Sequence, residues 1–204
     1  MAKISTYPID STVNGLDILI GSDADDSSIT KNYSINSIKA YSLSGLGVAI
    51  TSVLVAQSNV NQLPSGTNNP LQVTFGAAQG TPSDPVQLLA TGEIVFNQGG
   101  QYLFNGYANF EREGNQGGNT VTVFRALLNG VQVTPTKAVE LDKINVMIPY
   151  ELTIPIYVNA GDVLTWEIMR DSSGVDGGGL YTHTVSGGWT NVPSADLNIF
   201  KIGI

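Results

Sequence analysis

The chain has 204 residues, of which 42% are hydrophobic and only 13% charged, with a formal net charge of −8 and no cysteine. The acidic balance argues against a nucleic-acid partner, because affinity for phosphates rests on Lys and Arg side chains. Without cysteine there is no disulfide, zinc–thiolate site or thiol nucleophile. The first ten residues lack the apolar segment of a secretory signal, and no run of about 18 apolar residues predicts membrane insertion.

The N-terminal region, residues 1–46, differs from everything that follows it. We predict two short strands in "LDILIGSD" (16–23) and "ITKNYS" (29–34), an exposed acidic turn between them, and a single helical turn in "INSIKAYSL" (35–43). A piece of this size rarely buries enough apolar surface to fold alone. We therefore expect residues 1–46 to dock on another protein.

Residues 47–70 are predicted to form a linker or stalk. Their second half is polar and carries Pro64, Gly66 and Pro70. Their first half is rich in β-branched residues, and two interpretations are equally supported there. In the first interpretation it forms an extended stalk or a strand added to a neighbouring subunit. In the second it is the ordinary first strand of the domain that follows.

Residues 71–204 show strand signals throughout and no helix-length pattern. "GEIVFNQGGQYLFNGYANFERE" predicts two strands around Gly99 and Gly100, and in "TVTVFRALLNGVQVTPT" Asn129 and Gly130 suit a type I′ hairpin turn. Closely spaced, glycine-rich turns separate the segments. The class expected is all-β, an antiparallel sandwich or closed barrel.

The next pair of strands is defined by strict alternation. "VMIPYELTIPIYV" (146–158) has an apolar residue at every second position, and Pro149 and Pro155 place it at a sheet edge or bend it there, because proline cannot donate to the ladder. After the turn "NAGD" (159–162), "VLTWEIMR" is predicted to pair with it as an antiparallel hairpin.

The last segment, "DLNIFKIGI", is apolar on both faces. Leu197 and Ile199 share one face, and Phe200, Ile202 and Ile204 share the other. Because an exposed apolar strand would aggregate, we interpret the strand as covered twice, with one face in a subunit contact.

The order of these segments resembles the C1q/tumour-necrosis-factor-like family. It is carried by "GGQYLFNGYANF", "VFRALLNGVQV", "LTIPIYVNAGDVLTWEIMRDSSG", "GGLYTH" and "SADLNIFKIGI", and "DSSGVDGGG" departs from it by its high glycine content. The resemblance implies an antiparallel jelly-roll sandwich, residues 71–204, that forms a homotrimer. The positions that it places in the trimer interface are Tyr102, Phe104, Leu197, Ile199, Phe200 and Ile202.

A second resemblance covers the N-terminal region. "D-x-L-I-G-S-D" followed by "D-S-x-x-T-K-N-Y-S-I-x-x-I" resembles an N-terminal element of fibre and decoration proteins of tailed bacteriophages. That resemblance implies attachment of a projecting domain to a virion protein of the capsid or tail. The residues that would dock are Ile20, Thr30, Lys31, Asn32, Tyr33, Ile35 and Ile38.

Sites of catalysis or metal binding are not indicated. His183 is the only histidine, and a general base needs an orienting partner and a nucleophile that the sequence does not place beside it. The acidic run from Asp23 to Asp26 lacks the sixth-position glycine of an EF-hand and has Ser34 where its glutamate belongs. Asp171 and Asp176 are interpreted as residues of a solvated turn. We expect no enzyme, cofactor or metal.

Two functions follow as expectations. The first is a structural protein of a phage virion, a homotrimer docked through residues 1–46 with a projecting jelly-roll head. The alternative is a receptor-binding module whose loops recognise a host-surface glycan through Trp189, Tyr181 and His183. For Trp189 we favour a second interpretation, packing on the rim of the sandwich, because tryptophan is often mostly buried.

Overall fold

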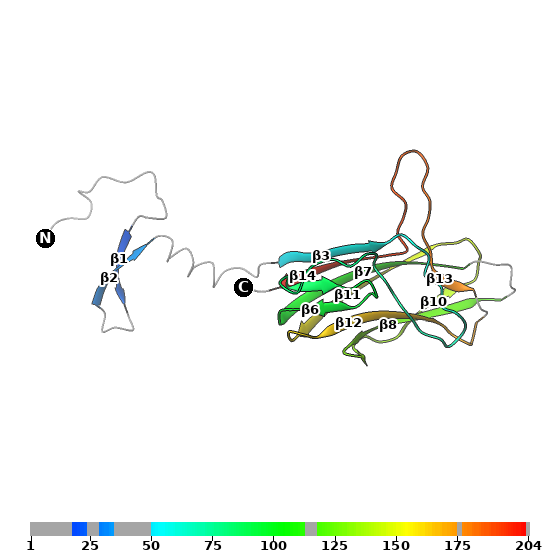
Figure 1. The fold of residues 1–204 in the computed structure, drawn as a ribbon, viewed down its shortest axis with the longest axis horizontal. Coiled ribbons are helices and arrows are strands. Elements are labelled where there is room, and N and C mark those ends of the chain that lie inside the picture. Colours follow the sequence, from blue (N-terminus) through cyan, green and yellow to red (C-terminus); the bar gives the residue numbers. More distant parts are fainter. Residues whose placement is uncertain (1–17, 24–28, 35–49, 113–117, 175–176, 203–204) are drawn as a thin grey trace. The chain divides into compact units, whose positions relative to one another are not determined.

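The computed structural model describes residues 18–23, 29–34, 50–112, 118–174 and 177–202, and every element among them is a β-strand (Figure 1). The chain divides into two compact units, which are considered separately. The first comprises Met1–Val48 with Ile204, and the second is Ala49–Gly203.

The first unit contains one antiparallel pair of strands. β1 (Ile18–Asp23) pairs with β2 (Ile29–Ser34), so that Ile18 lies opposite Ser34 and Asp23 opposite Ile29. Both strands predicted for this region are confirmed. The turn between them and the predicted helical turn at 35–43 lie outside the described residues.

The second unit is a sandwich of two antiparallel sheets. The seven-stranded sheet has the order β10-β8-β12-β6-β5, with β4 added to β12 and β9 added to β8. Its strands are β4 (Leu71–Gln72), β5 (Val86–Leu88), β6 (Ile94–Phe96), β8 (Thr120–Leu128), β9 (Val131–Gln132), β10 (Lys137–Leu141) and β12 (Val163–Arg170).

The five-stranded sheet has the order β11-β7-β14-β3, with β13 added to β7. It faces the seven-stranded sheet across the core (Figure 1). Its strands are β3 (Ile50–Ser58), β7 (Gly100–Arg112), β11 (Ile148–Val158), β13 (Gly178–Leu180) and β14 (Ala195–Ile202). The predicted fold class, an all-β antiparallel jelly-roll sandwich, is confirmed.

Aromatic residues from both sheets fill the core. The Trp166 ring lies 5.8 to 6.0 Å from those of Phe75, Phe104 and Phe124. Gly106 leaves room for this cluster, because a Cβ there would lie 2.8 Å from Trp166 and 2.6 Å from Phe104. Close packing of rings from both sheets supplies much of the hydrophobic free energy that holds the sheets together.

The predicted hairpin between 146–158 and 163–170 is wrong. β11 is the edge of the five-stranded sheet, as its two prolines predict, whereas β12 pairs with β8, β6 and β4 in the other sheet. The turn between β11 and β12 therefore crosses from one sheet to the other, and Gly161 N donates to Phe96 O at 2.7 Å. Alternation shows that each strand has one buried face, but strands facing each other across a core alternate just as paired strands do.

Residues 47–70 are not simply a linker. β3 is the first strand of the sandwich, pairs with β14 along its length and belongs to the unit Ala49–Gly203. Of the two interpretations left open for this segment, the structure therefore has the ordinary first strand. The turn at Asn129 and Gly130 is confirmed, with φ angles of 51° and 77°.

Candidate functional site

The predicted trimer interface is wrong at four of its six positions. Tyr102, Phe104, Leu197 and Ile199 are 0 to 2% exposed and point into the core of their own sandwich. Side chains with no accessible surface cannot contact a second subunit. Phe200 and Ile202 differ, because they are partly exposed.

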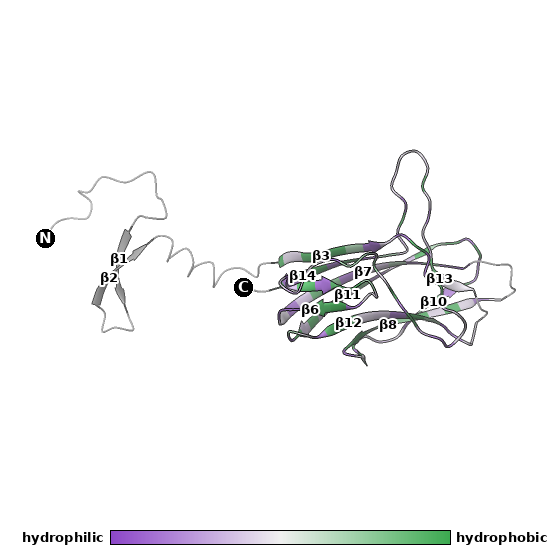
Figure 2. Cartoon of the chain, in the orientation of Figure 1, coloured by the Kyte–Doolittle hydropathy of each residue, from purple (hydrophilic) through white to green (hydrophobic). Residues whose placement is uncertain are grey.

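The outer face of the five-stranded sheet carries an apolar patch. Phe200 of β14 lies opposite Leu103, which lies opposite Pro155, and Tyr157 of β11 is 76% exposed. Directly opposite residues on antiparallel strands project to the same face. Along β3, the strand beside β14, the residues change from hydrophobic at the start of the strand to hydrophilic at its end (Figure 2). The apolar patch consists of Ile50, Leu103, Pro155, Tyr157, Phe200 and Ile202.

An acidic patch lies further along the same face. Asp196 of β14 is opposite Tyr107 of β7, which is opposite Glu151 of β11. With Asn105 and Asn198 these residues line a hollow of about 250 Å³. Partial burial raises the pKa of the Asp196 carboxyl above its ordinary value, and the negative charge of Glu151 raises this pKa further. Burial likewise raises the pKa of the Tyr107 phenol.

A second feature is the arm, residues 182–193, which projects from the sandwich between β13 and β14 (Figure 1). His183 and Val192 exchange two backbone hydrogen bonds of 3.1 and 2.9 Å at its base. Gly187 and Gly188 turn the chain at its tip with φ angles of 78° and 83°, which suit glycine. Trp189 follows them and is 78% exposed, so the arm presents a large aromatic ring to solvent, and the interpretation that Trp189 packs on the sandwich rim is wrong.

Asn109, which is 1% exposed, holds both ends of the arm. Its backbone carbonyl accepts from Tyr181 N at 2.9 Å, and its backbone N–H donates to Ser194 O at 2.9 Å. Its side-chain amide donates to Pro193 O at 2.7 Å and accepts from the Tyr107 hydroxyl at 2.9 Å. One buried residue therefore fixes where the arm leaves and rejoins the sandwich.

The predicted glycan-binding residues do not come together as one surface. Trp189 and His183 are exposed on the arm, but Tyr181 is only 4% exposed at its base. The buried Tyr181 ring has no free face on which a sugar could stack, so its inclusion in the set is wrong. The sequence contained a signal for this difference, because Tyr181 directly follows the apolar strand β13, whereas Trp189 follows a Gly-Gly turn.

Of the predicted docking residues, the structure places Ile20 on β1 and Thr30, Lys31, Asn32 and Tyr33 on β2. Ile20 lies opposite Asn32 in the pairing of the two strands. Ile35 and Ile38 lie outside the described residues. The most specific part of the motif thus forms one regular strand.

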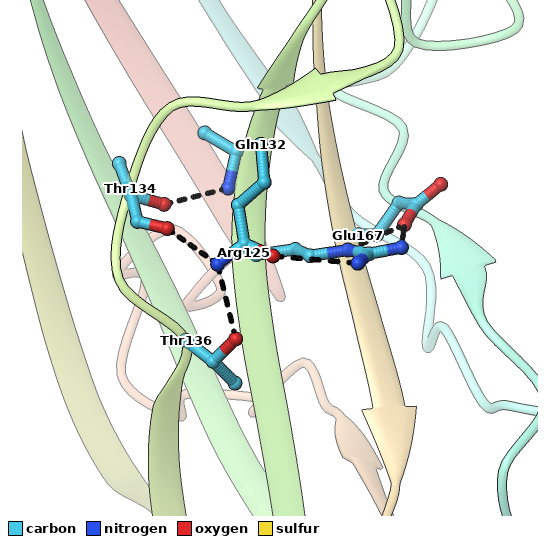
Figure 3. A network of polar contacts seen from close by, with 6 residues as sticks. Arg125, Gln132, Thr134, Thr136 and Glu167 are labelled. Carbon is cyan, nitrogen blue, oxygen red and sulfur yellow. Dashed lines mark hydrogen bonds and ion pairs between the residues drawn. The ribbon is translucent and has the colours of Figure 1, made fainter.

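A polar network on the seven-stranded sheet joins β8, β9 and β12 (Figure 3). Arg125 forms an ion pair with Glu167 at 2.9 Å and also donates to Gln132 at 3.3 Å, and Gln132 donates to Thr134 O and Thr136 Oγ1. The hollow beside it measures about 120 Å³, whereas ligand pockets usually exceed about 300 Å³. These groups form hydrogen bonds and an ion pair with one another, and we assign the network a structural role.

The remaining candidate sites of the sequence concern metal binding and membrane insertion. Among the described ranges, no three His, Cys, Asp or Glu side chains lie close enough together to hold a metal ion. Asp171 accepts a hydrogen bond from Ser173 N at 2.8 Å, and its interactions with Ser173 lower its pKa, as in a local turn. Asp176 is outside the described residues. In the same described part, no helix is long and apolar enough to cross a membrane.

Comparison with known proteins finds similarity among solved structures. No family model matches the chain, and no curated protein matches it. Among solved structures it is similar to the globular domain of zebrafish complement 1qA protein, with 16% identity and a TM-score of 0.38, over 72% of this chain and 94% of that one. A similarity of this size carries no argument about function, and the fold assignment rests on the two sheets and their strand order.

We expect Asn109→Ala to loosen the arm. The change removes the donor to Pro193 O and the acceptor of the Tyr107 hydroxyl, so the free energy of unfolding should fall by roughly 1–3 kcal/mol. Hydrogen exchange of the His183 and Val192 amides should accelerate beyond the change expected from global stability. Asn105→Ala, at an exposed position on the same strand, is the control. Unchanged exchange in the arm of Asn109→Ala would contradict the assigned role.

Proposed function

We propose that the chain is a non-enzymatic structural protein of a tailed-bacteriophage particle. Residues 1–46 attach it to a capsid or tail protein, and the sandwich projects as a homotrimeric head. The observation that carries the proposal is that the segment with the phage-like motif belongs to a compact unit of its own, in which "ITKNYS" forms β2. An attachment element separate from the globular domain suits a projecting fibre or decoration protein.

The apolar patch supports the homotrimer. It is an outward face of regular sheet, and exposed apolar patches on soluble domains mark contacts with other proteins. Ile50 and Tyr157 are 63% and 76% exposed, so burying them against another subunit removes apolar surface from water. This assignment keeps Phe200 and Ile202 from the sequence prediction and replaces the four buried residues with outward neighbours.

Trimerisation would strengthen attachment without any new contact. Three N-terminal elements joined to one head act together, because binding of the first raises the effective concentration of the other two at the particle surface. The mechanism is association alone, driven by apolar burial at the subunit contact and at the docking site.

Phe200→Asp and Tyr157→Asp should each convert the trimer to monomers. A carboxylate buried at a subunit contact without a partner loses its hydration, and Tyr157 is exposed enough for its replacement to leave the protomer folded. Light scattering of the full chain gives the mass, and circular dichroism verifies folding. Val131→Asp, on the exposed strand β9 of the other sheet, should remain trimeric. A monomeric wild-type chain would overturn the proposed trimer.

Attachment to the particle has a direct test. Antibodies raised against residues 49–203 should label density-purified particles of a phage that carries the gene, seen by immunogold electron microscopy. Particles from a mutant in which residues 30–33 are replaced by Gly and Ser should carry no label, although the head still accumulates in the lysate. Unlabelled wild-type particles would contradict the virion assignment.

The exposed Trp189 favours one second candidate, recognition of a host-surface glycan. An aromatic ring offers an apolar face to the C–H groups of a sugar, and Asn109 holds the base of the arm that carries it. Under this alternative the arm, and not the N-terminal unit, performs the function.

On a glycan array, Trp189→Ala should lose affinity by about tenfold or more if this alternative holds, equivalent to about 1.4 kcal/mol of binding free energy. Trp189→Phe should retain much of it. Because the ring is exposed, the free energy of unfolding of both variants should lie within about 0.5 kcal/mol of the wild-type value. This measurement separates lost binding from lost folding. Absence of binding by the wild-type chain to any glycan would exclude the alternative.

A further inference from the structure

The apolar and acidic patches share one strand and one face. Phe200 and Asp196 both project outward from β14, about 13 Å apart at the usual rise of a strand. A stable protein interface buries about 800 Å² on each partner, roughly 28 Å in each direction. A contact of that size centred on the apolar patch reaches the row of Asp196, Tyr107 and Glu151 as well.

The acidic patch is poorly suited to burial in its charged form. On the two strands beside β14, the residues opposite Asp196 are Gln57 of β3 and Tyr107 of β7, neither of them a cation, and β11 contributes Glu151 opposite Tyr107. A homotrimer over this face brings three copies of the Asp196–Glu151 pair toward one axis.

The other charged residues of these strands do not face Asp196. The Lys201 amine donates to Gln98 Oε1 at 2.8 Å and lies over the Tyr102 ring. Arg112 is buried at the end of β7 that pairs with β13, and Glu111 beside it adds a further negative charge near that end. The like charges of Asp196 and Glu151 oppose association, and burial in low dielectric increases this cost.

We propose that the acidic patch makes the homotrimer pH-dependent: protonation of Asp196 strengthens subunit association, and a rise in pH weakens it. The proposal rests on the homotrimer and extends it, because it states which condition controls assembly. A particle protein of this kind would hold its head together more tightly in an acidic medium.

The direction follows from proton linkage. Asp196 already has a raised pKa in the single chain, because of burial and then of Glu151. Further burial at the subunit contact raises this pKa again, so the trimer binds more protons than three separate subunits. Association is therefore favoured as the pH falls through the range between the two pKa values of Asp196. At higher pH the repulsion is fully present.

The test uses the full chain in EDTA, which removes metal ions as an alternative cause. Sedimentation equilibrium between about pH 7.5 and pH 5 gives the concentration at which half of the trimer dissociates. The range stays above the isoelectric point of about 4.4, where a net charge near zero promotes non-specific association. We expect this concentration to fall by about tenfold or more toward pH 5, since each unit of pKa shift corresponds to a factor of ten.

The variants decide which group responds. Asp196→Asn should be a tight trimer at pH 7.5, with most of the pH dependence gone, and Glu151→Gln, at an exposed position, should weaken the dependence without risk to the fold. Asp142→Asn makes the same charge change in the exposed loop before β11 and should behave as the wild type.

The outcomes separate the two proposals. A wild-type trimer whose dissociation does not change with pH overturns the proposed pH dependence and leaves the proposed homotrimer intact. A chain that is monomeric at every pH and concentration overturns the homotrimer itself. Equal pH dependence in the wild type, Asp196→Asn and Asp142→Asn would assign the effect to net charge and would also overturn the role of the acidic patch.

Discussion

The pairing of β14 on both of its edges is the constraint on which the rest of the structure depends. β14 lies between β7 and β3, and its side chains alternate between core and outer face from Ala195 to Phe200. Leu197 and Ile199 are therefore core residues, while Asp196 and Phe200 face outward. A one-residue shift in register would exchange these two sets. The same pairing thus defines both the core and the outer face of the five-stranded sheet.

The outer face and the projecting arm are connected through β7. Tyr107 faces outward beside Asp196, and its hydroxyl donates to Asn109, which holds both ends of the arm. The two prolines of β11 hinder the addition of another strand at that edge of the sheet, because proline cannot donate to a ladder. The proposed subunit contact and the candidate glycan-binding arm therefore depend on neighbouring residues of one strand.

Local patterns predicted the elements well because their causes are local. Alternation in "VMIPYELTIPIYV" predicted β11 and its two prolines predicted an edge strand. Asn129 and Gly130 predicted a turn that needs positive φ. The hairpin between β11 and β12 was predicted wrongly, because alternation reports that a strand has a buried face without saying which strand lies beside it.

The sequence by itself determined the all-β class, the places of the long strands β7, β8, β11, β12 and β14, and the two apolar faces of β14. Only the tertiary structure decided which of those faces is the core of one subunit, and so removed Tyr102, Phe104, Leu197 and Ile199 from the surface. It also decided that Tyr181 is buried while Trp189 is exposed, and it aligned Asp196 with Glu151 across a strand between them. The reason is physical: periodicity is set by neighbours along the chain, whereas burial and register are set by strands distant in sequence.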